Sequence, residues 1–119
     1  MTLLDQAELA KHDINYEAGM NRFMGKEALF ERFLLKFPSD PSYEALVKAI
    51  ESGDCQEAFS QAHTLKGVTA NLALDGLFKV ADQATEAFRA GDFEAGKAFL
   101  PQITDRYNDV IAFLKGLQA

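Results

Sequence analysis

The chain has 119 residues, 48% of them hydrophobic and 25% charged, and a formal net charge of −6 at pH 7. We expect one soluble domain spanning residues 1–119 and no nucleic-acid partner, because a phosphate backbone repels so acidic a surface. The single cysteine, Cys55, leaves no intrachain disulfide to form. Neither a signal peptide nor an apolar run near the ~20 residues of a membrane span is visible, so we expect a cytoplasmic protein.

Apolar residues at helical spacing predict short helices in the first third of the chain. Two such stripes lie within residues 16–23 and 29–37, and Pro38 ends the second. The next helix is expected to start with Asp40 as its N-cap and Pro41 as its first residue, where a missing N–H costs nothing.

Two similar tripeptides lie between apolar stripes in the second half of the chain, Ser-Gly-Asp at 52–54 and Ala-Gly-Asp at 90–92. In each, the glycine is expected to end one helix in the left-handed conformation, and the aspartate to cap the next. Two helices are predicted between them, at roughly 54–73 and 75–90, with Asp75 as the cap of the second. Such brief connections place successive helices side by side and antiparallel.

The last predicted helix has the most regular apolar stripe, with spacings of three and four residues that are typical of a bundle seam. Its members are Leu100, Ile103, Tyr107, Val110, Leu114 and Leu117. Pro101 is expected either to kink this helix or to begin its straight part. Because no segment alternates at period two, we predict an all-α protein: an antiparallel four-helix bundle with additional short N-terminal helices.

The helix predicted at 54–73 carries a histidine at the edge of its core-facing arc. The arc consists of Cys55, Ala58, Phe59, Ala62, Leu65, Thr69, Leu72 and Ala73. His63 lies about 100° round the helix from Ala62, and its neighbours three or four residues away are small, apart from Lys66. Such small neighbours leave an imidazole accessible.

Gly67, one turn after this histidine, costs the helix about 1 kcal/mol relative to alanine. It removes the side chain that would crowd the imidazole, and Lys66 can reach a group attached to the ring. An accessible imidazole beside a cation suits a nucleophile that accepts a dianionic phosphoryl group. The plainer interpretation is that His63 is merely half-exposed, that Gly67 lets another helix pack closely, and that Lys66 is a solvated charge.

Other residues support weaker interpretations. His12 lacks a lysine–glycine neighbourhood and is expected to be a surface residue. Cys55 lies on the core arc and is expected to serve packing. Most phenylalanines are expected in the core, with Phe78 or Phe88 as candidates for an apolar docking patch near the histidine.

The sequence Ala-His-Thr-Leu-Lys-Gly-Val-Thr-Ala-Asn-Leu-Ala at 62–73 resembles the signature of the histidine phosphotransfer (HPt) domain, H-x-L-K-G followed by small residues and often N-L-G. The matching residues are His63, Leu65, Lys66, Gly67, Asn71 and Leu72. The resemblance covers most of the chain, because residues 19–37 are similar to the family's N-terminal segment. Residues 77–92, including Arg89, are similar to the helix that follows the site.

Two positions depart from the family's pattern. Ala73 stands where the family commonly has glycine, a change that can tighten a helix contact. Thr85 stands where the family has a Glu or Gln that hydrogen-bonds the imidazole, and its shorter side chain puts that orientation in doubt. Glu86 is about 100° further round and substitutes only if the helix is rotated.

The resemblance implies a monomeric phosphorelay intermediate. His63 would accept a phosphoryl group from a receiver-domain phosphoaspartate or a histidine kinase, by in-line attack of its neutral imidazole, and pass it to another receiver's aspartate. Lys66 would stabilise the phosphoryl group, and Gly67 would give clearance. Mg²⁺ would be supplied by the receiver, so we expect no cofactor or metal on this chain. Because no Gly-rich phosphate loop is present, we expect a phosphocarrier and no ATP-dependent kinase activity.

Three alternatives stay open. The first is a non-phosphorylated bundle that only binds a receiver or another partner. The second is a bundle that holds a ligand or metal inside, although the interior stripes are apolar and Glu-x-x-His pairs are absent. The third is the phosphoacceptor module of a chemotaxis-type kinase, against which the chain's own ends suggest a complete protein.

Overall fold

The computed structural model describes residues 5–118, which fold into helices joined by short connections. The helices are α1 (Gln6–Lys11), α2 (Tyr16–Arg22), α3 (Glu27–Lys36), a 3-10 turn at Phe37–Ser39, α4 (Ser42–Glu51), α5 (Cys55–Asn71), α6 (Asp75–Arg89), α7 (Phe93–Ala98) and α8 (Leu100–Gln118). Among these described residues, no strand forms, and no helix is both long and apolar enough to cross a membrane.

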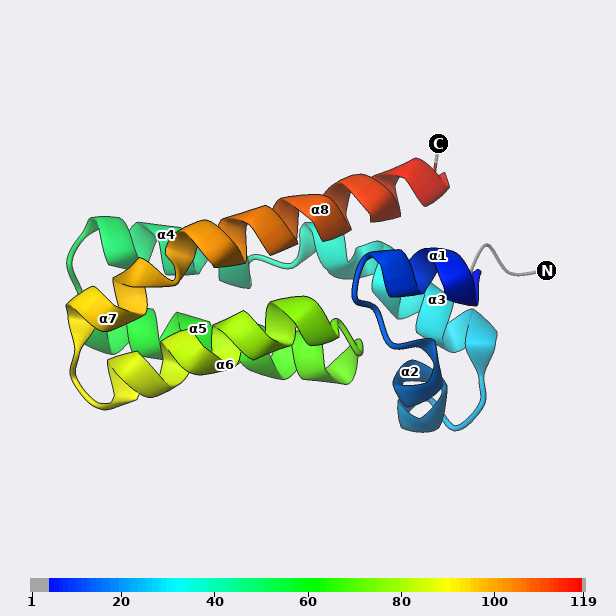
Figure 1. Cartoon of the computed structure of the whole chain (residues 1–119), viewed down its shortest axis with the longest axis horizontal. Coiled ribbons are helices and arrows are strands. Elements are labelled where there is room, and N and C mark those ends of the chain that lie inside the picture. Colours follow the sequence, from blue (N-terminus) through cyan, green and yellow to red (C-terminus); the bar gives the residue numbers. More distant parts are fainter. Residues whose placement is uncertain (1–4, 119) are drawn as a thin grey trace.

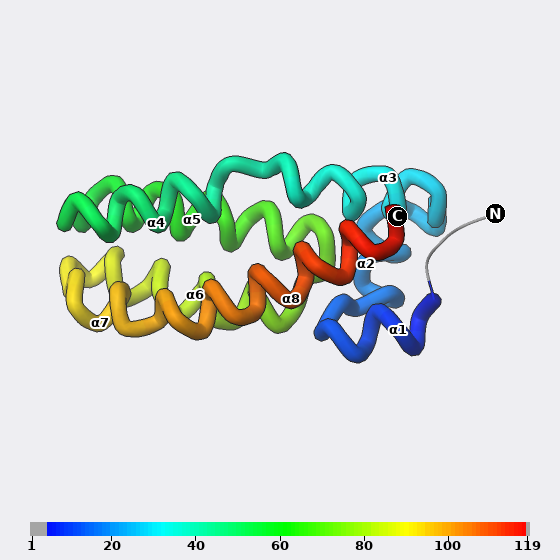
Figure 2. The backbone as a smooth tube through the Cα atoms, turned by 90° about the horizontal axis from the view of Figure 1, so that it is seen from above, coloured from blue at the N-terminus to red at the C-terminus, as the bar shows by residue number. Residues whose placement is uncertain are grey.

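Helices α4, α5, α6 and α8 form the predicted antiparallel four-helix bundle, within an elongated molecule of 45 × 27 × 20 Å. The short helices α1, α2 and α3 gather at one end of the bundle, and α7 lies at the other (Figure 1). Seen from above, α4 and α5 lie along one side and α6 and α8 along the other (Figure 2). Helix α7 is an addition to the prediction, which did not separate it from α8.

The predicted helix ends at Gly53 and Gly91, and the predicted caps at Asp54 and Asp92, are confirmed. Gly53 and Gly91 have φ of +73° and +79°, the left-handed conformation that glycine adopts at little cost. The carboxylates of Asp54 and Asp92 accept the backbone N–H of the third residue beyond them, at 3.0 Å in both cases. Pro101 is the second residue of α8, where its missing N–H removes no intrahelical bond.

The predicted caps of α4 and α6 are both displaced by one residue. The prediction that Asp40 caps α4 and that Pro41 is its first residue is wrong: Pro41 occupies the cap position and Ser42 is the first helical residue. The Asp40 carboxylate still accepts the backbone N–H of Ser42 at 2.9 Å. The prediction that Asp75 caps α6 is wrong: Leu74 occupies the cap position, and Asp75 is the first helical residue. The Asp75 carboxylate instead accepts a hydrogen bond from the side-chain amide of Asn15 at 3.1 Å, a partner 60 residues away.

The core follows the predicted stripes. On the arc of α5, Cys55 and Phe59 are partly buried and all other predicted members are buried: Ala58, Ala62, Leu65, Thr69, Leu72 and Ala73. On α8, Ile103, Val110 and Leu114 are buried and the other members of the stripe are partly buried, so the stripe faces the core. His63 lies outside the buried arc of α5 and is exposed.

The N-terminal helices are tied to the bundle through the connection between α1 and α2. Asn15 donates its backbone N–H to the carbonyl of Ala73 at 2.9 Å. His12 approaches the Asp109 carboxylate at 2.8 Å and stacks on Phe113 with ring centroids 4.2 Å apart. His12 therefore lies at the surface as a partly buried residue, with its side chain 23% exposed and engaged by α8.

Candidate functional site

His63 is exposed on the outer face of α5, halfway along the bundle. Its imidazole stacks on the ring of Phe59, one turn earlier, with centroids 5.8 Å apart and an interplanar angle of 21°. Among the residues from 5 to 118, no group hydrogen-bonds to this imidazole. Both ring nitrogens are therefore left to solvent or to an incoming group.

Gly67 lies on the same open face. Apart from its chain neighbours and the backbone of its own helix, no described atom lies within 4 Å of the position that a Cβ would take. This geometry excludes the interpretation that the glycine is needed for another helix to pack. Helical side chains lean toward the N-terminus, so a side chain at Gly67 would extend over the turn that carries His63.

Lys66 bridges to the neighbouring helix. Its ammonium lies 2.9 Å from the carboxylate of Asp82 on α6, and the two side chains are 27% and 41% exposed. Nothing in the sequence indicates this partner, because helical periodicity does not determine which residues of two helices face each other. The lysine is therefore held across the surface between α5 and α6 beside His63.

A second contact between these helices lies on the other side of His63. The Arg89 guanidinium lies 4.9 Å over the centre of the Phe59 ring and also donates to Glu86 at 2.9 Å. In the antiparallel register shared by this contact and the Lys66 ion pair, position 85 is level with the histidine. Thr85 therefore lies level with His63 on α6, at the position where the family resemblance places a Glu or Gln.

The side chain at that position does not orient the imidazole. Thr85 is fully buried, and its hydroxyl donates to the carbonyl of Ala81 on its own helix at 2.7 Å. Glu86 points to Arg89 and does not replace it. The doubt about Thr85 is therefore justified, and Glu86 does not substitute for it. The ring contact that the imidazole does make is the stack on Phe59.

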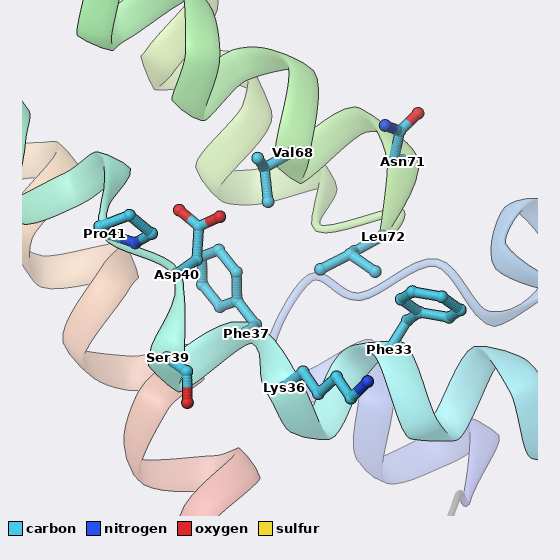
Figure 3. A pocket seen from close by; sticks show the side chains of 9 residues that line it. All are labelled: Phe33, Lys36, Phe37, Ser39, Asp40, Pro41, Val68, Asn71 and Leu72. Atoms are coloured by element: carbon cyan, nitrogen blue, oxygen red, sulfur yellow. The ribbon is translucent and has the colours of Figure 1, made fainter.

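The C-terminal end of α5 carries the remaining signature residues. Asn71 is exposed at the rim of an apolar groove between α5 and the segment that joins α3 to α4, into which Val68 and Leu72 project (Figure 3). Ala73 has φ of +57°, a left-handed backbone conformation that glycine adopts more easily than alanine. The family's glycine at this position is therefore explained by the backbone conformation, and the expected tighter helix contact is not the reason for the difference.

The candidate docking phenylalanines lie mostly inside. Phe88 is 3% exposed and packs against Phe93, so its proposed place on an apolar docking patch is wrong. Phe78 is partly buried. Cys55 is partly buried, with its sulfur 3.8 Å from the Phe88 carbonyl, as expected for packing. A large apolar side chain that is exposed is Phe33, at 42%, on the far side of the groove in Figure 3.

Fold and site together define a helical bundle that presents one histidine, flanked by a lysine and an unobstructed glycine, on its outer face. The family model of the Hpt domain matches residues 34–113, about two thirds of the chain. The chain therefore belongs to the Hpt domain family. The match runs from the end of α3 into α8 and includes His63. Comparisons with curated proteins and with solved structures find no match.

Proposed function

We propose that this protein is a cytoplasmic phosphorelay intermediate that carries a phosphoryl group on His63. Hpt domains are phosphocarriers that interact with receiver domains and kinases. The observation that carries the proposal is the exposed His63 imidazole, with no hydrogen-bond partner among the described residues and with free space over Gly67. A residue in that setting is accessible to a phosphoaspartate on a second protein.

The reaction transfers one phosphoryl group between two proteins. A lone pair on a neutral ring nitrogen of His63 attacks the phosphorus of an aspartyl phosphate in line, which forms a phosphorus–nitrogen bond. The phosphorus–oxygen bond to the donor breaks, and its electron pair leaves with the aspartate carboxylate. The proton on the other ring nitrogen is then free to pass to water, and the same steps in reverse deliver the group to a recipient aspartate.

Lys66 supplies the electrostatic part of this scheme. Its ammonium lies one turn from His63 and stabilises negative charge on the phosphoryl oxygens, an effect that is strongest as charge spreads over them in the transition state. The divalent cation of the reaction is proposed to reside on the receiver, so that this chain contributes the nucleophile and one cation. Gly67 leaves room for the receiver's approach.

The test is incubation of the protein with a panel of phosphorylated receiver domains. We expect phosphate that is labile in acid and stable in base to appear on this chain, and to disappear when a second, unphosphorylated receiver is added. Binding to a receiver without any transfer would favour the adaptor alternative, in which the bundle only holds partner proteins.

A further inference from the structure

The ion pair between Lys66 and Asp82 links the proposed phosphoryl-stabilising residue to the neighbouring helix α6. We propose that Asp82 is a positioning residue, which holds the Lys66 ammonium while His63 is free and competes with the phosphoryl group for it once His63 is phosphorylated. This inference rests on the proposed function and adds to it a control on how long the phosphoryl group is retained.

The geometry allows the lysine to serve both partners. Lys66 is three residues beyond His63 on α5, which places the two side chains on adjacent turns of one face. Asp82 lies across from Lys66 on α6, 2.9 Å from its ammonium. A lysine has a flexible four-carbon stem and a compact charge, so a rotation of that stem redirects the ammonium along the surface from Asp82 toward the imidazole.

The pair is partly exposed, which lowers the free-energy cost of such an exchange. The two side chains are 27% and 41% exposed, so that water and salt screen their attraction. A phosphoryl group carries nearly two negative charges at neutral pH, against one on the carboxylate. The ammonium is therefore expected to leave Asp82 for the phosphoryl oxygens when His63 is loaded.

The carboxylate left behind acts against the loaded state. Asp82 still attracts the lysine away from the phosphoryl oxygens. When the phosphoryl group is lost to water, a phosphorus–oxygen bond forms and the phosphorus–nitrogen bond breaks, with its electron pair remaining on the imidazole. The imidazole is a better leaving group when its other ring nitrogen is protonated. A lysine released from Asp82 opposes that protonation, so removal of the carboxylate should prolong the phosphohistidine.

The experiment uses the full chain and phosphoramidate, a small-molecule phosphoryl donor, with loss of phosphohistidine followed by phosphorus NMR. The signal of His63 is assigned by its absence in His63→Gln. We expect Asp82→Asn to slow the loss about two- to fivefold, the range of an exposed ion pair, and Asp82→Glu to restore the original rate. The control is Asp105→Asn, which makes the same charge change at an exposed position on α8 and should leave the rate unaltered.

A double variant decides whether the effect passes through the lysine. On a Lys66→Met background, Asp82→Asn should no longer slow the loss. Equal rates in Asp82→Asn and Asp105→Asn would overturn the inference, and so would an undiminished Asp82→Asn effect without the lysine. Because phosphoramidate needs no receiver, failure of every receiver to load the chain would refute the proposed function and leave this measurement intact.

Discussion

Replacement of Gly67 by alanine is expected to stabilise the fold, although the position belongs to the candidate site. Gly67 is helical, and its missing Cβ faces open space. Alanine should therefore raise the free energy of unfolding by up to about 1 kcal/mol, through helix propensity and a less flexible unfolded chain. With an unfolding entropy of roughly 2.1 cal/mol/K per residue, 1 kcal/mol corresponds to about 4 °C in Tm for a chain of this length.

Gly91→Ala is the matched control. It is the same substitution, also with no atom within 4 Å, but at a φ of +79° that costs an alanine about 1 kcal/mol or more. The two variants should therefore differ by about 2 kcal/mol, or about 8 °C, in opposite directions from the parent. Differential scanning calorimetry and urea unfolding measure both changes. A Gly67→Ala protein that melts below the parent would refute the reasoning, because it would mean that a structural contact depends on this glycine.

The functional arm uses a longer side chain at the same position. Gly67→Gln should fold with nearly unchanged stability, yet its side chain would extend over the turn of His63 and reduce phosphoryl transfer sharply. Transfer from a phosphorylated receiver in single turnover is the measurement. Full activity in Gly67→Gln would show that the glycine does not provide the clearance assigned to it.

Three further predictions concern the site and its support. His63→Gln should abolish phosphoryl acceptance with a normal circular dichroism spectrum and Tm, because the side chain is exposed; acceptance that persists would place the site elsewhere. Lys66→Ala should slow transfer or shorten the life of the phosphohistidine while costing at most about 1 kcal/mol of stability, since its pair with Asp82 is partly exposed and therefore screened by water. A loss confined to receiver affinity in titration calorimetry would make it a docking residue. Gly96→Ala should lower stability by about 1–3 kcal/mol in urea unfolding, because a Cβ there would overlap the buried Phe88 ring; an unchanged midpoint would contradict the close packing of α7 on α6.

The sequence was sufficient for the bundle and for the face that carries the histidine. Apolar spacing, together with the glycine–aspartate pairs at 53–54 and 91–92, indicates where helices end and begin, because each signal is local. The same periodicity places His63 at the edge of the buried arc, and the residue is exposed. Helical periodicity also predicts that Gly67 lies within a helix, one turn after His63. Only the structure shows that the space beside this glycine is empty.

What the sequence could not supply are contacts between distant segments. The partners Lys66 and Asp82 depend on the rotation and register of two packed helices, which neither helix determines alone. Asp75 resembles a cap, but a side chain from the N-terminal connection binds it. Thr85 is level with the histidine, yet its hydroxyl turns back to its own helix, a rotamer choice that no spacing predicts. The left-handed conformation of Ala73 could not be predicted from the sequence, because alanine rarely adopts it.

The central claim, that His63 carries the phosphoryl group, is tested most directly by locating that group after reaction with a phosphorylated receiver. Phosphorus–proton correlation NMR of the intact protein, with fragmentation mass spectrometry of its peptides kept in base, distinguishes the two histidines of the chain. We predict one phosphoryl group per chain, bonded to a ring nitrogen of His63. Phosphate found on His12 or on a hydroxyl side chain, or no incorporation from any receiver of a broad panel, would contradict the account.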